Sequence, residues 1–187
     1  MKVEPTPLPG VLVIEPAVHG DARGFFLETF QEQRYLEAGV RAHFVQDNHS
    51  HSQRGVLRGL HYQLRRPQAK LVHVLRGEVF DVALDIRRGS PTFGQWFGTV
   101  LSESNHRQLY IPPDFAHGFC VLSDHCDFLY KCSDYYVPDD QCGIAWDDPG
   151  LGIDWQVSGP TLSPKDLRNP RLSECPEDLL PIWGGEP

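Results

Sequence analysis

The sequence predicts an all-β domain, a sandwich or barrel with a few short helices. Roughly nine or ten short runs are rich in β-branched and aromatic residues, and only a few residues separate them. The 17 glycines and 16 prolines are scattered along the chain, as expected for turns between strands. A chain of 187 residues is long enough for one domain with its own core, and nothing in it indicates a second domain.

The alternation expected of a strand is clearest over residues 79–86. Phe80 and Val82 fall on one face there, and Asp81 and Asp85 fall on the other. The other predicted elements are strands at residues 11–14, 25–30, 44–48, 56–63, 70–75, 96–101, 107–111, 118–122 and 126–135, a turn at 19–24 and a polar loop at 49–54.

Two helices are expected. Residues 31–38 form the first, and Gly39 follows them as a residue suited to the left-handed conformation at a helix end. A shorter helix is predicted at residues 164–167, where Ser163 can cap the first turn and Pro164 occupies its first position.

Composition excludes several classes of partner. The net charge of −8 argues against nucleic acid or an anionic membrane surface, since both require a basic face. No apolar run reaches the roughly 20 residues that span a bilayer, and the N-terminus lacks the apolar segment of a secretory signal. Five cysteines without metal-knuckle or disulfide spacing indicate a cytoplasmic protein with reduced thiols.

The segment from Arg58 to Gln63, with Lys70 seven residues later, is the strongest functional signal. It places a guanidinium, an imidazole (His61), a carboxamide and an ammonium group in a region predicted to be β-strand. Polar and charged groups rarely enter a β-rich core without partners, and His is the usual proton carrier near neutral pH. We therefore expect a sheet-lined pocket that moves protons on an anionic substrate.

Several segments in one register resemble the dTDP-4-dehydrorhamnose 3,5-epimerase family over roughly residues 8–170. The matching segments are residues 20–26 (GDARGFF), 44–50 (FVQDNHS), 56–63 (VLRGLHYQ), 77–87 (GEVFDVALDIR), 90–96 (SPTFGQW), 111–119 (IPPDFAHGF), 128–136 (FLYKCSDYY) and 162–166 (LSPKD). The resemblance implies one cupin-like jelly-roll domain over residues 1–187, with a C-terminal tail packed on a core at about 8–170, and a homodimer.

The resemblance also implies a reaction. A nucleotide-linked 4-keto-6-deoxy sugar loses a proton next to its ketone, and the resulting enolate is reprotonated from the other face, at C5 and at C3. No cofactor is expected, because the ketone itself accepts the electrons. The implied substrate is dTDP-4-dehydro-6-deoxy-D-glucose and the implied product is dTDP-4-dehydro-L-rhamnose.

Four residues match the catalytic positions of the family. His61 resembles the proton acceptor, Asp166 the carboxylate that orients it, and Tyr130 the proton donor on the opposite sugar face. Lys70 matches the cation that stabilises the developing oxyanion. Without the resemblance, each has an ordinary structural alternative: a His bonded to backbone, a surface Asp, a core aromatic residue and a Lys at a strand end.

Further positions match residues that contact the substrate in the family. They are Arg23, Glu28, Gln46, Asp47, Asn48, Arg58, Gln63, His117, Tyr136, Gln141 and Lys165. Surface salt bridges and turn chemistry are the alternatives for the charged and amide residues, and packing is the alternative for Tyr136. Gln141 departs from the family pattern, since many members carry Glu there, and this leaves the identity of the substrate open.

A metal ion is not expected, although many cupins hold one. His49 and His51 form the pair of the cupin metal motif, but no acidic residue follows at the required spacing. Cys120, Cys126 and Cys132 have apolar neighbours, so we expect them to be packed in the core.

Three alternatives to the double epimerase stay open at this point. A mono-epimerase acting at C3 or C5 alone would share the same His and Asp. Another isomerase of nucleotide-linked sugars, including GDP- or CDP-sugars, could use the same scaffold. A non-catalytic sugar-binding cupin is a third, but it would be expected to lack the base or the acid.

Overall fold

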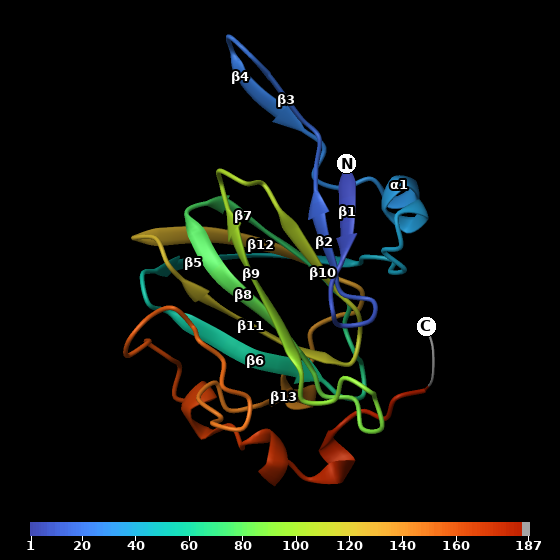
Figure 1. The fold of residues 1–187 in the computed structure, drawn as a ribbon, viewed down its shortest axis with the longest axis vertical. Helices are drawn as coiled ribbons and strands as arrows, with labels where there is room; N and C mark the ends of the chain where they lie inside the picture. The colour runs from blue at the N-terminus through green and yellow to red at the C-terminus, as the bar shows by residue number, and fades with distance from the viewer. Residues whose placement is uncertain (185–187) are drawn as a thin grey trace.

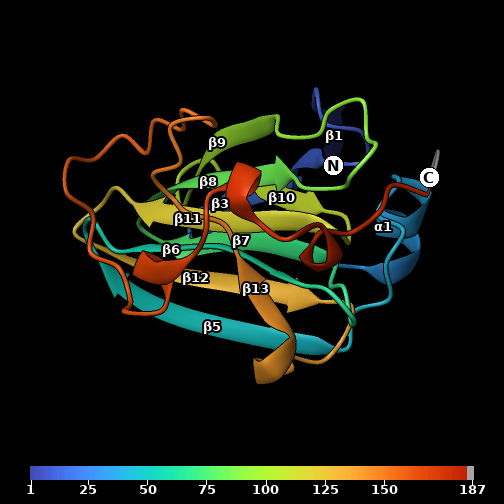
Figure 2. The ribbon, with the colours of Figure 1, turned by 90° about the horizontal axis from the view of Figure 1, so that it is seen from below.

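A computed structural model of the protein describes residues 1–184, and residues 185–187 of the predicted domain lie outside this described part. Two antiparallel sheets face each other and confirm the predicted all-β sandwich (Figures 1 and 2). One sheet has the order β1 (Lys2–Pro5), β2 (Leu12–Glu15), β10 (Gln108–Ile111), β7 (Lys70–Arg76), β12 (His125–Cys132) and β5 (Gln46–Gln53). The other has the order β13 (Gln141–Gly143), β6 (Leu57–Gln63), β11 (Phe115–Val121), β8 (Glu78–Asp85) and β9 (Trp96–Ser102).

The helices are short, as expected. Helix α1 (Glu32–Glu37) begins after Gln31, whose side chain accepts a hydrogen bond from the Arg34 amide, and Gly39 follows it with a φ of 99°. The short helix predicted near residue 164 is a single 3₁₀ turn, η2 (Asp166–Arg168). Three similar turns are η1 (Pro138–Asp140), η3 (Leu172–Glu174) and η4 (Glu177–Leu179).

The predicted loop at residues 49–54 is wrong, because most of it belongs to β5. This strand pairs with β12 from Gln46 to Gln53 without interruption. Its inward side chains, such as Asn48 and Ser50, face a polar cavity, while its outward ones face solvent. Both faces are therefore polar, and the apolar alternation that identifies a half-buried strand is missing.

Three apolar clusters hold the sandwich together. The first lies between the sheets and includes Phe119 and Phe128, whose rings stack 4.1 Å apart. The second lies beneath the five-stranded sheet, where the C-terminal segment contributes Leu172 and Leu180. The third lies under α1 on the outer face of the six-stranded sheet, around Tyr35. Because strand β8 has packing on both faces, its residues from Val79 to Asp85 are all buried.

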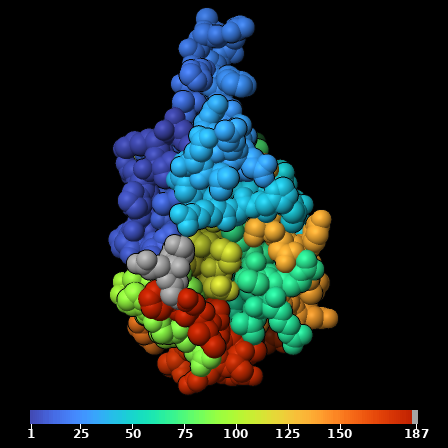
Figure 3. Space-filling view, turned by 90° about the vertical axis from the view of Figure 1, so that its right-hand side faces the viewer, coloured from blue at the N-terminus to red at the C-terminus, as the bar shows by residue number. Residues whose placement is uncertain are grey.

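A hairpin formed by β3 (Val18–Asp21) and β4 (Gly24–Leu27) stands apart from the sandwich. Within the described part of the chain the two strands pair only with each other, and the hairpin projects from the body as a narrow arm (Figures 1 and 3). Phe25 and Phe26, near its tip, are 63% and 71% exposed. A two-stranded hairpin with exposed aromatic residues is marginally stable alone in water.

Candidate active site

A cavity of about 560 Å³ lies between the two sheets. Strands β5, β7 and β12 form one wall and strands β6 and β11 form the other, while residues 161–166 close one side. The structure brings together eleven of the predicted site residues along this cavity: Gln46, Asn48, Arg58, His61, Lys70, His117, Tyr130, Tyr136, Gln141, Lys165 and Asp166.

His61 and Asp166 form a hydrogen-bonded pair although they are 105 positions apart. His61 Nε2 lies 2.5 Å from Asp166 Oδ1, which assigns the ring proton to Nε2 and leaves Nδ1 as the free acceptor. The first residue of η2 is Asp166, and its backbone amide donates to Ser163 Oγ at 3.1 Å. The C-terminal part of the chain thus places the Asp166 carboxylate next to β6, the strand that carries His61.

The Asp166 carboxylate is held in its charged form. Burial acts to raise the pKa of Asp166. The hydrogen bond and charge of His61, together with a hydrogen bond from Ser163, lower this pKa by more than burial raises it, so the net shift is downward. A buried carboxylate that stays ionised can fix the tautomer of its His partner and stabilise the imidazolium ion.

Tyr130 enters the cavity from the wall opposite His61, since β12 and β6 belong to different sheets. Burial raises the pKa of its phenol, and the neighbouring Cys132 adds to this shift, while Arg58 opposes it. The phenol therefore stays protonated across the neutral range and can act as a proton donor.

Lys70 lies on β7 directly opposite Cys132 of β12 and faces the cavity. Burial lowers the pKa of its ammonium group, against smaller opposing effects of Cys132 and Asp81. Among residues 1–184, no side chain makes a hydrogen bond or ion pair with it. An unpaired cation in a confined site is suited to stabilise a negative charge that develops on a ligand.

His117 lies beside His61, its register partner on the neighbouring strand β6. Its Nε2 is 3.0 Å from both carboxylate oxygens of Asp81, a residue with no exposed surface, and its ring stacks on Phe128. Burial lowers the pKa of His117, and the charge of Asp81 only partly compensates for this.

The rest of the cavity wall carries amides, a guanidinium and an aromatic ring. Arg58 is held by Ser52 Oγ, to which its Nε and Nη2 donate at 3.2 and 3.1 Å. The Tyr136 hydroxyl donates to Gln141 Oε1 at 2.6 Å, so the uncharged amide at this position accepts from the ring that lies next to it.

Four predicted residues do not line the cavity. Asp47 lies on the outer face of β5, where it accepts hydrogen bonds from Lys131 Nζ, because strand alternation separates it from its neighbours in sequence. Gln63 is buried at the end of β6, where its carboxamide bonds to the backbone of two loops. Arg23 is in the hairpin arm, paired with Asp21, and Glu28 follows the arm, paired with Arg34.

Sequence reasoning missed several residues that line the cavity. Ser50, one of them, has a buried hydroxyl that finds no hydrogen-bond partner among residues 1–184. Once residues 46–53 are recognised as a strand, Ser50 falls on the same face as Gln46 and Asn48, which is the signal that could have found it. Others are Gln68, Phe119, Phe128, Cys132 and Ser163.

His49 and His51 lie on the outer face of β5, away from the cavity. Their ring nitrogens lie 3.0 and 2.9 Å from Asp127 Oδ1 on the neighbouring strand. Within the described residues, no three His, Cys, Asp or Glu side chains are grouped so that they could hold a metal ion. No helix of residues 1–184 is long and apolar enough to cross a membrane.

Comparison with known proteins identifies the family. The family model for dTDP-4-dehydrorhamnose 3,5-epimerase matches residues 5–174. The dTDP-4-dehydrorhamnose 3,5-epimerase of Pseudomonas aeruginosa is 55% identical over 177 residues, which cover 94% of this chain and 98% of the relative.

Two solved structures share the cupin-like fold. The dTDP-6-deoxy-D-glucose-3,5-epimerase of Legionella pneumophila, in complex with dTDP-4-keto-L-rhamnose, is 53% identical with a TM-score of 0.96, over 98% of this chain and 99% of that one. A 3′-monoepimerase from Streptomyces bikiniensis, in complex with dTDP-quinovose, is 33% identical with a TM-score of 0.90, over 95% and 92% of the two chains. The chain therefore belongs to the dTDP-4-dehydrorhamnose 3,5-epimerase family.

Proposed function

We propose that the protein inverts C3 and C5 of dTDP-4-dehydro-6-deoxy-D-glucose to give dTDP-4-dehydro-L-rhamnose. One observation carries this proposal: a His–Asp pair and a protonated Tyr enter one cavity from opposing sheets, with the unpaired Lys70 on the same wall as the Tyr. Membership of the epimerase family and the likeness to an epimerase structure with a keto-sugar bound support it.

In the proposed reaction, His61 Nδ1 removes the proton from C5, and the electrons move onto the C4 ketone. The enolate oxygen is stabilised by the Lys70 ammonium group, and the imidazolium by Asp166. The Tyr130 hydroxyl then donates its proton to the opposite face of C5. The phenolate regains a proton, His61 releases the one it took, and the cycle repeats at C3.

The remaining cavity residues are proposed to bind the substrate. Arg58 and Lys165 offer positive charge to a diphosphate, and the Tyr136 ring offers an aromatic face to a nucleobase. Hydrogen bonds to the sugar and the nucleotide are proposed for the other polar side chains of the cavity, those of Gln46, Asn48, His117 and Gln141.

The proposal is tested by proton NMR of the reaction in deuterium oxide, starting from dTDP-4-dehydro-6-deoxy-D-glucose. Two solvent deuterons, at C3 and C5, are expected in a product of L-rhamno configuration. One deuteron would show a mono-epimerase, the second candidate, which the likeness to a 3′-monoepimerase favours. Stabilisation by GDP- or CDP-sugars but not by dTDP-sugars in a thermal-shift panel would point to another isomerase.

The lowered pKa of Lys70 predicts the alkaline limb of the pH profile. The ammonium form is present below this pKa and is lost as the pH rises through it, so kcat falls at a lower pH than an ordinary lysine would give. In the Lys70→Arg variant, this limb moves up by about one pH unit or more, since a guanidinium does not deprotonate in this range. The pH profile of kcat checks this, and an unchanged limb in the variant would assign it to another group.

We also propose a homodimer in which the arm of one protomer completes the cavity of the other. Arg23 and Glu28 match substrate-contacting positions, yet the structure places them away from the cavity of their own chain. Contact between the arm and a second copy would cover Phe25 and Phe26 and pair an otherwise isolated hairpin.

The cytoplasm is the proposed location, consistent with the five unpaired cysteines.

Mixing two defective variants tests the shared cavity. Arg23→Ala and His61→Asn homodimers are each expected to have low activity, but after exchange of subunits about a quarter of the sites should contain both native residues. Light scattering should give about twice the 21.2 kDa mass of the chain. Mixing Lys70→Met with His61→Asn is the matched control. Both residues line the cavity of their own chain, so every site of a mixed dimer lacks one of them and no activity should return. A monomer, or no recovery with the first pair, would refute the shared cavity.

A further inference from the structure

We propose that Gln63 is a positioning residue, which fixes Tyr136 at the cavity and does not itself contact the ligand. This inference rests on the proposed function, since it concerns the part of the wall that would bind the nucleotide. It differs from the sequence-based expectation, which placed Gln63 among the residues that contact the substrate.

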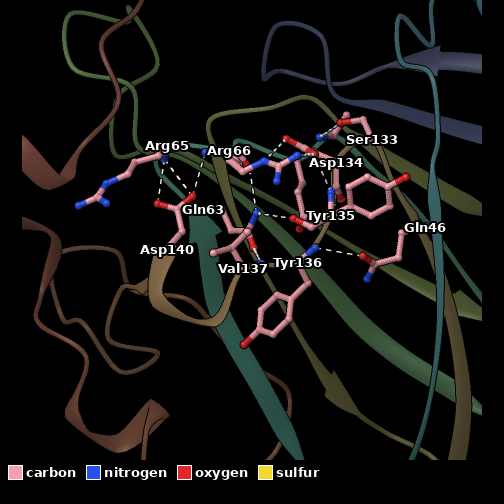
Figure 4. A network of polar contacts seen from close by, with 12 residues as sticks. Gln46, Gln63, Arg65, Arg66, Ser133, Asp134, Tyr135, Tyr136, Val137 and Asp140 are labelled. Atoms are coloured by element: carbon pink, nitrogen blue, oxygen red, sulfur yellow. Dashed lines mark hydrogen bonds and ion pairs between the residues drawn. The ribbon is translucent and has the colours of Figure 1, made fainter.

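The carboxamide of Gln63 is fully engaged by the chain itself. Its Nε2 donates to the backbone oxygens of Arg66, at 2.8 Å, and Tyr135, at 3.2 Å, and its Oε1 accepts from the Val137 amide at 2.7 Å (Figure 4). The residue is only 5% exposed and does not line the cavity. Two donors and one acceptor are needed at this point, and among side chains of this length only Gln supplies them.

These bonds fix the backbone on both sides of Tyr136. Gln63 holds the carbonyl before it and the amide after it, and Gln46 Oε1 accepts from the Tyr136 amide at 3.0 Å (Figure 4). Gln46 begins β5 of one sheet and Gln63 ends β6 of the other. The position of Tyr136 is thus set relative to both walls of the cavity.

The surrounding loops are joined by further bonds. The buried Asp140 carboxylate accepts from the backbone amides of Arg65 and Arg66, and Arg66 is paired with Asp134 (Figure 4). Gln68 Nε2 donates to the Asp134 carbonyl at 2.7 Å. The loop that carries Tyr136 is therefore held against the β6–β7 connection, and Gln63 makes the bonds that lie on either side of the ring-bearing residue.

Tyr136 itself is half-exposed at the cavity, and its hydroxyl bonds to Gln141. Without Gln63, its backbone would sample more conformations, and part of the binding free energy would be spent on ordering the loop. The proton-transfer residues lie on β6, β7 and β12 and on η2, and the bonds of Gln63 do not hold their side chains. Loss of Gln63 should therefore weaken binding and leave the chemical step intact.

The test compares Gln63→Met with Tyr62→Phe. Tyr62 is a matched control on the same strand, because it is 4% exposed, does not line the cavity, and its hydroxyl donates to a loop carbonyl, that of Leu179, at 2.8 Å. Both variants are expected to lower Tm. Only Gln63→Met should raise KM and the Kd for dTDP, by about tenfold, with kcat within about threefold of the native value.

A double-mutant cycle shows whether Gln63 acts through Tyr136. In a Tyr136→Ala background, Gln63→Met should weaken dTDP binding by no more than about twofold, since the group it positions is already gone. Equal effects in both backgrounds, a fall in kcat with unchanged KM, or an unchanged Kd in Gln63→Met would overturn the inference. Failure of the native protein to bind dTDP would instead refute the proposed function, so the two outcomes are distinguishable.

Discussion

His61→Asn is expected to reduce deuterium exchange at both C3 and C5 by about 10³-fold or more, because no other group in the proposed mechanism accepts the substrate proton. Asn is polar and smaller than His, so it should fit the site, but it cannot take a proton at pH 7 and does not reach Asp166 as His61 Nε2 does. Exchange is measured by proton NMR in deuterium oxide, and Tm by thermal melting.

Two measurements keep this result interpretable. Binding of dTDP to His61→Asn should be close to native, since the imidazole is proposed to act on the sugar carbon. His125→Asn is the matched control, because His125 lies on an exposed strand end outside the cavity, and it should keep full activity. If folded His61→Asn kept more than about one tenth of the native rate of deuterium exchange, another base would remove the substrate proton.

Tyr130→Phe is expected to separate proton removal from inversion. His61 can still remove and return a proton on one face, so the starting sugar should gain deuterium at C5 without a change of configuration. Formation of the inverted product should fall by about 10²-fold or more, because the donor on the other face is missing. NMR follows both processes in the same sample, one as loss of the C5 proton signal and the other as appearance of product.

Tyr135→Phe is the control for this second variant. Tyr135 is an exposed neighbour of Tyr136 and does not line the cavity, so removal of its hydroxyl should leave both processes unchanged. If Tyr130→Phe lost exchange and inversion to the same extent, the phenol would be needed for proton removal as well, and the division of roles proposed here would be wrong.

The sandwich could be predicted because its core obeys a simple period. Strand β8 places Phe80, Val82 and Leu84 on one face and Asp81 and Asp85 on the other, and the two aspartates are buried partners of His117 and Arg87. The predicted strand at residues 44–48 overlaps the start of β5, but residues 49–53 of this strand fall in the predicted loop, since the inner face of β5 lines a polar cavity and its outer face meets solvent. The local hydrophobic pattern identifies a strand where at least one face is apolar, and it does not identify one where both faces are polar.

The candidate site likewise has a part that the local sequence predicts and a part that it does not. The residues of one strand, Arg58 and His61, could be recognised from their spacing, but the partner of His61 lies 105 positions away. Only the resemblance to a family connected the two. The roles proposed for Gln63 and Arg23 depend on loops and on a projecting arm, and neither leaves a periodic signal in the sequence.

The central claim is that the keto-sugar ring lies between His61 and Tyr130, with its C4 oxygen near Lys70. A crystal structure with a dTDP-linked hexose bound tests this most directly. The account predicts His61 Nδ1 and the Tyr130 hydroxyl on opposite faces of the ring, each within about 4 Å of C5, a distance that allows proton transfer after small motions. Both groups on the same face, or a hexose bound outside the cavity, would contradict it.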